Sequence, residues 1–104
     1  MHDYTCQVCG TRLTTPAGPY AEAAHIRALG LPHNGPDVLE NLLCLCPNDH
    51  VRFDAGAIYI DHSYGVRESG THTSLGALKL RAGHTPDHNY ITYHRVHFAG
   101  QIGT

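Results

Sequence analysis

The chain has 104 residues, a formal net charge of −2 with histidine neutral, no tryptophan and two phenylalanines. This length corresponds to a single domain with a modest hydrophobic core. Because domains that bind nucleic acid tightly on their own usually have a basic surface, the charge argues against an independent DNA-binding module.

The cysteines are interpreted as metal ligands. The chain has four of them, and its first residues, MHDYTCQVCG, contain no apolar run typical of a secretory signal. Cysteines in such a chain favour metal binding over disulfides. We therefore expect a cytoplasmic protein. We expect no membrane contact either, because no run approaches the roughly 18 apolar residues of a membrane helix.

The first quarter of the chain opens with a metal-binding motif. Residues 4–10 (YTCQVCG) contain two cysteines separated by two residues, which can bind one ion, and Gly10 permits the tight turn. A redox-active cysteine pair is the alternative for the same motif. Residues 11–19 are rich in turn-forming residues, and residues 20–26 are predicted to form a strand.

A loop, a strand and a helix are predicted next. Glycine and proline exclude a regular element from residues 27–39. Residues 41–46 (NLLCLC) are predicted to form a buried second strand. Pro47 suits the first turn of a helix, which is predicted over residues 47–55.

The second half of the chain carries no decoded motif. Strands are predicted at residues 57–61, 64–67 and 75–82. Thr-Pro-Asp at residues 85–87 is typical of a helix start and predicts a helix over about residues 86–98 that ends near Gly100. The histidines of this half match no motif spacing and are interpreted as packing or surface residues: His62, His72, His84, His88, His94 and His97.

Five features occur in order between residues 4 and 61: CxxC, AHI, a Gly/Pro loop with Asp37 and Asn41, LCPNDH, and FD. Together they resemble the HNH endonuclease family. The resemblance implies an α+β fold, in which a small ββα-metal (HNH) core carries a structural zinc knuckle, extra β-strands and a C-terminal helix. Residues 1–104 are then a single HNH nuclease domain, of which residues 62–104 are an undecoded extension.

The resemblance implies catalytic roles for four residues. His25 resembles the general base that activates water, and Asn41 resembles the asparagine that orients it. His50 resembles the ligand of the catalytic Mg²⁺ or Mn²⁺. Asp54 lies four residues further on and therefore on the same helix face, where it is expected to bind the same ion.

Two positions depart from the family pattern. Many members have an aspartate or histidine directly before the base as a metal ligand, whereas this chain has Ala24. Glu22, on the same predicted strand face, is a weak candidate to replace that ligand. Cys44 is the alternative to the aspartate in the set of zinc ligands that the register implies: Cys6, Cys9, Cys46 and Asp49.

The resemblance also implies partners. The residues of the motif look most like those of the HNH modules that are fused to a domain that reads modified bases in restriction enzymes. The substrate is then DNA, cut to leave a 5′ phosphate and a 3′ hydroxyl, and a fused or separate recognition domain would hold it. Cutting both strands needs two active sites, which a homodimer would supply.

Three further residues near the motif are interpreted as contacts. Arg27 and Arg52 flank the candidate site in sequence and are candidates for DNA phosphate contacts, because the guanidinium fork suits phosphate. A solvated surface position is the alternative for both arginines. His33, inside the loop, is interpreted as a contact to solvent or to the DNA backbone.

A second hypothesis is a zinc-stabilised DNA-binding or interaction module with a degenerate active site. Ala24 and the acidic net charge favour this hypothesis. The joint presence of His25, His50 and Asp54 favours a nuclease instead.

Overall fold

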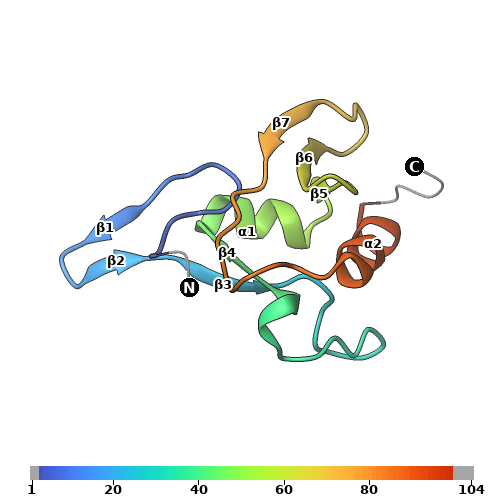
Figure 1. The fold of residues 1–104 in the computed structure, drawn as a ribbon, viewed down its shortest axis with the longest axis horizontal. Helices are drawn as coiled ribbons and strands as arrows, with labels where there is room; N and C mark the ends of the chain where they lie inside the picture. Colours follow the sequence, from blue (N-terminus) through green and yellow to red (C-terminus); the bar gives the residue numbers. More distant parts are fainter. Residues whose placement is uncertain (1–2, 100–104) are drawn as a thin grey trace.

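The computed structural model describes residues 3–99 (Figure 1). Its strands are β1 (Leu13–Thr15), β2 (Gly18–Tyr20), β3 (Glu22–His25), β4 (Leu42–Leu45), β5 (Ile58–Ile60), β6 (Gly65–Glu68) and β7 (Ser74–Ala77). Its helices are the short 3-10 helix η1 (Leu39–Asn41) and the α-helices α1 (Pro47–Asp54) and α2 (His88–His97). None of the helices in this part of the chain has the length and apolar character needed to cross a membrane.

The predicted ββα core is present. Strands β3 and β4 pair antiparallel, with His25 opposite Leu42, and α1 packs on both strands. Leu43 and Leu45 of β4 are fully buried, which explains the continuous apolar run of this strand. Asn41, predicted as the first residue of the second strand, instead closes η1 directly before it.

The turn-forming residues of segment 11–19 do form a turn, at Pro16 and Ala17, but the sequence did not predict the two strands of the β1–β2 hairpin on either side of it. Nearly all of its side chains are exposed, so it lacks the apolar alternation that indicates a strand. The Thr15 hydroxyl closes the turn by donating to the Gly18 carbonyl at 2.7 Å. Figure 1 shows the hairpin extending away from the rest of the molecule.

A second sheet, β5–β6–β7, follows α1. The first two strands confirm the predictions at residues 57–61 and 64–67 to within two residues at each end. The strand predicted over residues 75–82 is wrong beyond Ala77. There the Lys79 N–H donates to the Gln7 carbonyl at 2.8 Å, and the Gln7 side chain donates back to the Lys79 carbonyl at 2.9 Å. The segment after β7 therefore fastens the N-terminal cysteine motif instead of continuing the sheet.

The C-terminal helix is confirmed as α2. The Asp87 carboxylate accepts from the Asn89 N–H and so starts the helix, while the predicted end near Gly100 lies outside the described residues. Helix α2 packs on β5. One apolar core joins the ββα unit to the β5–β6–β7 sheet and to α2. Its members are Ile26, Leu43, Leu45, Phe53, Ile58, Ile60, Val66, Leu78 and Ile91.

His94 fastens α2 to the end of α1. Its Nε2–H donates to the Phe53 carbonyl at 2.7 Å, and its ring stacks on the Phe53 ring with centroids 3.6 Å apart. Its Nδ1 is buried without a hydrogen-bond partner. Burial lowers the pKa of His94 from 6.5 to about 4, although the Phe53 carbonyl acts in the opposite direction. The ring is therefore neutral at neutral pH.

We predict that the protein loses stability as the pH falls from 6.5 toward 4. The pKa of His94 is lower in the folded chain, so its contribution is complete above pH 6.5 and is lost as the pH falls toward 4. A shift of this size corresponds to about 3 kcal/mol of unfolding free energy. Chemical denaturation at the two pH values should show a smaller drop for His94→Gln, which cannot gain this proton. An equal drop in both proteins would contradict the prediction.

Candidate functional site

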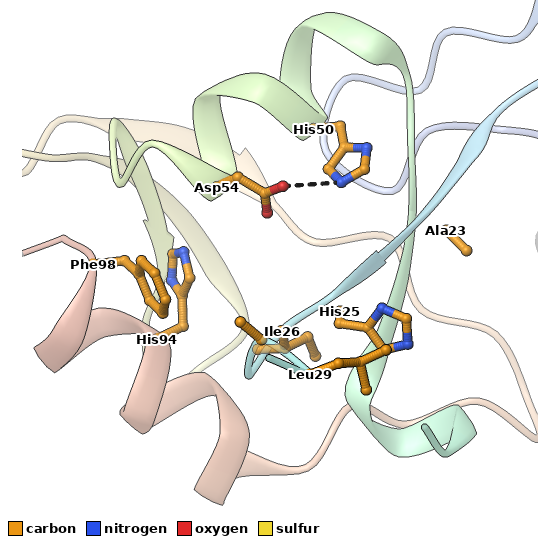
Figure 2. Close-up of a pocket in the computed structure, with 9 residues that line it drawn as sticks. Ala23, His25, Ile26, Leu29, His50, Asp54, His94 and Phe98 are labelled. Atoms are coloured by element: carbon orange, nitrogen blue, oxygen red, sulfur yellow. Dashed lines mark ion pairs between the residues drawn. The ribbon is translucent and has the colours of Figure 1, made fainter. Parts of the chain in front are cut away.

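A cavity of about 420 Å³ lies where β3, the loop after it, α1 and α2 meet (Figure 2). Three residues predicted to be functional line it: His25, His50 and Asp54. The remaining lining residues are Ala23, Ile26, Ala28, Leu29, His94 and Phe98. The fold therefore brings the end of the first core strand and one face of α1 to the same hollow.

His50 is held by a carboxylate on each side of its ring. The helical spacing places Asp54 beside it, with His50 Nε2 3.1 Å from Asp54 Oδ2. On the other side, Nδ1 lies 2.8 Å from Glu22 Oε1 of β3. Because a carboxylate can only accept, Nδ1–H donates to Glu22. Asp54 is an acceptor too, so Nε2 faces it either as a second N–H donor or, with a cation between the two atoms, as a metal ligand. Histidines that bind metals are commonly oriented in this way.

Glu22 is fixed in turn by Tyr20, whose hydroxyl donates to Glu22 Oε2 at 2.6 Å. This hydrogen bond, and after it the one from His50, lowers the pKa of Glu22 below its ordinary value. The carboxyl is therefore charged at neutral pH. Glu22 contacts the ring of His50 on the nitrogen opposite the one that faces Asp54. Ala24, at the position of the missing family ligand, is fully buried in the core.

His25 is oriented by a residue to which the motif comparison gave no role. Its Nε2 lies 2.9 Å from Asp37 Oδ1, in the loop between β3 and β4. With Nε2–H donating to this carboxylate, the neutral ring of His25 has its lone pair on Nδ1. The GPD sequence of the loop was the only signal for Asp37, and it does not show which side chain the carboxylate contacts.

Asn41 ties the two ends of that loop together. It is fully buried. Its Oδ1 accepts from the Arg27 N–H at 2.8 Å, and its Nδ2 donates to the carbonyls of Arg27 (2.9 Å) and Pro36 (2.8 Å). Gly35 lies so close to the backbone at residues 27–28 that a Cβ would clash with the Arg27 carbonyl. The loop that follows His25 is therefore closed by its own backbone and one amide.

The two arginines predicted to contact DNA have partners within the chain. Arg27 Nε donates to the His33 carbonyl at 2.6 Å, and the Arg27 guanidinium lies 4.2 Å from the centre of the Tyr93 ring. Arg52 Nη1 donates to Asp49 Oδ1 at 3.2 Å. Both arginines are partly exposed, and their contact with phosphate stays a prediction.

His33, interpreted as a contact to solvent or the DNA backbone, has partners within the chain, and its contact with DNA stays a prediction. His33 is half-buried, and its Nδ1 lies 2.7 Å from the Tyr93 hydroxyl. Its ring also packs on Phe98, with centroids 4.8 Å apart. His33 therefore fastens the loop to α2, a contact that spacing in the sequence does not indicate.

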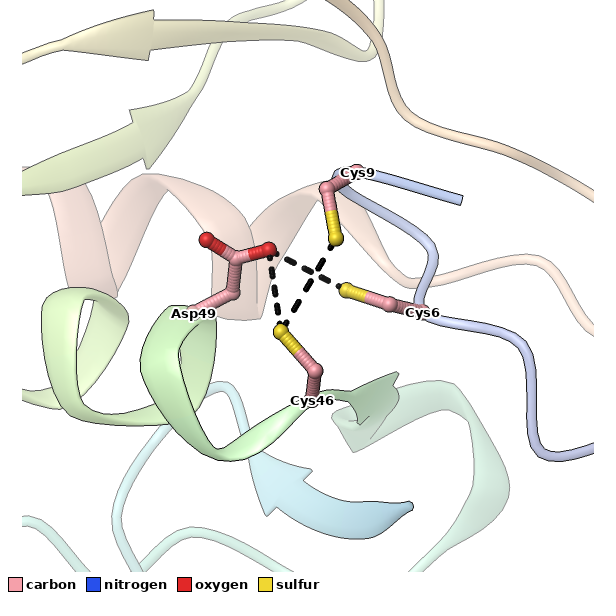
Figure 3. A group of neighbouring side chains, drawn as sticks. All are labelled: Cys6, Cys9, Cys46 and Asp49. Atoms are coloured by element: carbon pink, nitrogen blue, oxygen red, sulfur yellow. Dashed lines mark hydrogen bonds between the residues drawn. The ribbon is translucent and has the colours of Figure 1, made fainter. Parts of the chain in front are cut away.

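A second group of predicted residues meets at the start of α1 (Figure 3). One ligand atom from each lies within 4.8 Å of the others, an arrangement that can hold a metal ion: Cys6, Cys9, Cys46 and Asp49. Asp49 Oδ2 lies 3.2 Å from Cys6 Sγ and 3.4 Å from Cys46 Sγ. Cys44, the alternative ligand, is not part of this group within the described residues. All four cysteines are free thiols.

Without an ion, the buried thiols of Cys6 and Cys46 are protonated and Asp49 is a charged member of the cluster. Burial raises the pKa of Cys6 to about 12 and also raises the pKa of Cys46. Burial alone would raise the pKa of Asp49 as well, but hydrogen bonds from the surrounding thiols outweigh it and lower that pKa. Thiolates at this place need a compensating positive charge, which a divalent ion supplies.

Two comparisons with known proteins found a match. The model of a family described as HNH endonuclease matches residues 6–61. A solved structure titled "Modification dependent TagI restriction endonuclease" matches with a TM-score of 0.89 and 48% sequence identity. The match covers 91% of this chain and 33% of the other, so this chain spans about a third of the length of that protein. No curated protein matches the chain.

We predict that Asn41→Ala lowers the free energy of unfolding by about 3 kcal/mol, because it leaves buried backbone groups of the loop without partners. Asn41→Asp should be at least as harmful, since a carboxylate would face two carbonyl oxygens. Urea denaturation measures both changes.

Asn89→Ala is the matched control, because Asn89 is exposed on α2. This variant should stay within about 0.5 kcal/mol of the unchanged chain. The role given to Asn41 is wrong if Asn41→Ala is as stable as the control.

Proposed function

The chain belongs to the HNH endonuclease family, and we propose that it is the DNA-cleaving module of a modification-dependent restriction endonuclease. The observation that carries the proposal is the shared cavity: His25 lines it together with the His50–Asp54 pair. A base and a metal-binding pair around one hollow are what metal-assisted phosphodiester hydrolysis requires.

His50 and Asp54 would hold the catalytic Mg²⁺ or Mn²⁺. The donor set fits such an ion, because a carboxylate oxygen lies 3.1 Å from an imidazole nitrogen whose other nitrogen is bound to Glu22. Two protein ligands leave positions for water and for a phosphate oxygen. When bound, the ion neutralises the charge that develops on the phosphate and stabilises the departing oxygen.

His25 acts as the general base in this proposal. Asp37 accepts from Nε2–H, so Nδ1 is free to take a proton from the attacking water. The water oxygen bonds to phosphorus as the bond to the 3′ oxygen breaks. The departing 3′ oxygen takes a proton from solvent, which leaves a 5′ phosphate and a 3′ hydroxyl. Asp37 then stabilises the imidazolium that forms, and Asn41 keeps the loop that carries Asp37 in place.

Recognition of the target belongs to another part of the enzyme in this proposal. The chain spans about a third of the restriction enzyme that it resembles, and its own net charge is −2. A fused or separate domain that reads a modified base would supply the affinity for DNA that this charge disfavours. A homodimer would provide the two active sites needed to cut both strands.

The cluster at the start of α1 would bind a structural Zn²⁺. Three sulfurs and one carboxylate oxygen are a tetrahedral donor set that zinc accepts, although the carboxylate is the harder ligand. The ion would join the N-terminal motif to the first turn of α1. It would therefore fix the helix that carries His50 and Asp54.

We predict that the purified chain contains one zinc ion and that Cys46→Ser loses it, with a lower melting temperature. Cys44→Ser is the matched control, since Cys44 is buried beside the cluster but contributes no ligand atom. Metal analysis by mass spectrometry and thermal unfolding measure both effects. Retention of zinc by Cys46→Ser would contradict the cluster, and loss of zinc from Cys44→Ser would show that Cys44 and not Asp49 supplies the fourth ligand.

Cleavage of supercoiled plasmid at low salt tests the nuclease directly. The chain should nick the plasmid with Mg²⁺ or Mn²⁺ and not with EDTA, and His25→Ala should lower the rate by roughly 10²–10⁴-fold. The control His88→Ala, which changes an exposed histidine of α2, should cut at the unchanged rate. Equal cutting by the unchanged chain and His25→Ala would end this assignment and favour the degenerate binding module.

The variant Asp37→Asn tests whether Asp37 orients the base His25 or binds the metal ion. The amide oxygen can still accept from His25 Nε2–H but carries no charge, so we expect kcat to fall about tenfold while Mn²⁺ binding is unchanged. A parallel loss of Mn²⁺ affinity would place Asp37 in the metal site instead.

A further inference from the structure

A second cavity, of about 430 Å³, lies between the β5–β6 region and α2. Side chains between residues 59 and 72 line it, together with Arg95. Most of these residues lie beyond residue 61, where the family match ends. The nuclease chemistry proposed above does not use them.

Arg95 is the unusual member of this cavity. It is 3% exposed, yet it lines the hollow. The acceptors that its guanidinium reaches within residues 3–99 are uncharged: Nη1 donates to the Ile60 carbonyl at 3.3 Å, and Nη2 lies 3.1 Å from His62 Nε2. In this described part of the chain its buried Nε has no hydrogen-bond partner. A buried cation without a negative partner destabilises the fold. A ligand that supplies negative oxygens would remove this unfavourable free energy.

Asp61 is the one carboxylate that lines this cavity, and it already has hydrogen-bond partners. Asp61 Oδ2 accepts from Arg67 Nε at 2.9 Å, and Asp61 Oδ1 accepts from the N–H groups of Ser63 and Gly65. Asp61 therefore balances the charge of Arg67. The charge of Arg95 has no carboxylate partner among residues 3–99, in a chain whose net charge is −2.

Two histidines add further polar atoms to this wall. His62 is exposed at the rim, next to the Arg95 guanidinium. His72 is exposed as well and lines the same cavity, with its Nδ1 2.7 Å from the Tyr59 hydroxyl. A tetrahedral oxyanion matches these groups, because a guanidinium forms paired hydrogen bonds with phosphate oxygens.

We propose that this cavity binds a phosphate group, with Arg95 as its anchor and His62 at its entrance. The group is either a phosphate of the DNA backbone or a free phosphate ion. Helix α2 contributes to both cavities, with His94 in the wall of the first and Arg95 in the wall of the second, and this shared helix supports the first source. The DNA source rests on the proposed function, whereas phosphate binding itself does not.

The first experiment titrates the ¹⁵N-labelled chain with inorganic phosphate at constant ionic strength and follows the Arg95 Nε–H signal. We expect a saturable shift of this signal. His62→Glu, which places a negative charge at the entrance, should weaken the affinity roughly tenfold or more. His88→Glu makes the same charge change at an exposed position of α2 outside the cavity and should alter the affinity less than about twofold. Because both positions are exposed, both variants should fold.

The second experiment measures binding of the same proteins to duplex DNA. A larger loss for His62→Glu than for His88→Glu, with competition by phosphate, identifies a backbone phosphate as the ligand. Equal DNA binding by the two variants, with phosphate affinity still lost in His62→Glu, identifies a free phosphate. The proposal is overturned if the Arg95 signal does not respond to phosphate, or if both variants bind phosphate equally. Failure of plasmid cleavage with an intact phosphate response would count against the nuclease and not against this site.

Discussion

The candidate active site depends on how helix α1 is held at its two ends. At its first turn, Cys46 and Asp49 join a cluster with two thiols of the N-terminal motif. At its last turn, the Phe53 carbonyl accepts from His94 of α2 at 2.7 Å. A helix of eight residues is too short to be stable alone. Contacts from both halves of the chain therefore set the place of His50, which lies between the two anchors.

The two halves of the site have separate supports. The proposed metal pair lies on α1 and depends on the cysteine cluster and on Glu22 behind His50. The proposed base lies at the end of β3 and depends on the loop that Asn41 closes and on Asp37 within it. A zinc ion in the cluster would therefore fix the positions of His50 and Asp54 more directly than the position of His25. Each reactive ring is thus oriented by one hydrogen-bonded carboxylate, Glu22 for His50 and Asp37 for His25.

The sequence predicted the ββα core and the family because their signals are local. A proline at the start of α1 and the helical spacing around His50 depend only on neighbouring residues. The hairpin at residues 11–19 has exposed strands and so lacks an apolar pattern. The roles of Asp37 and Glu22, and the buried charge of Arg95, depend on segments that meet only in the folded chain. Motif spacing does not contain that information, whereas the cysteine cluster was found because its register is part of the motif.

The central claim is that His50 and Asp54 hold the catalytic ion while Glu22 only supports the ring. Line broadening by Mn²⁺ in the zinc-loaded, ¹⁵N-labelled chain tests it most directly, because a paramagnetic ion broadens the nuclei nearest to it. The account predicts that the ring nitrogens of His50 broaden first, and that Asp54→Asn weakens the effect more than Glu22→Gln does. Broadening that leaves His50 untouched, or that Glu22→Gln abolishes while Asp54→Asn does not, would contradict the account.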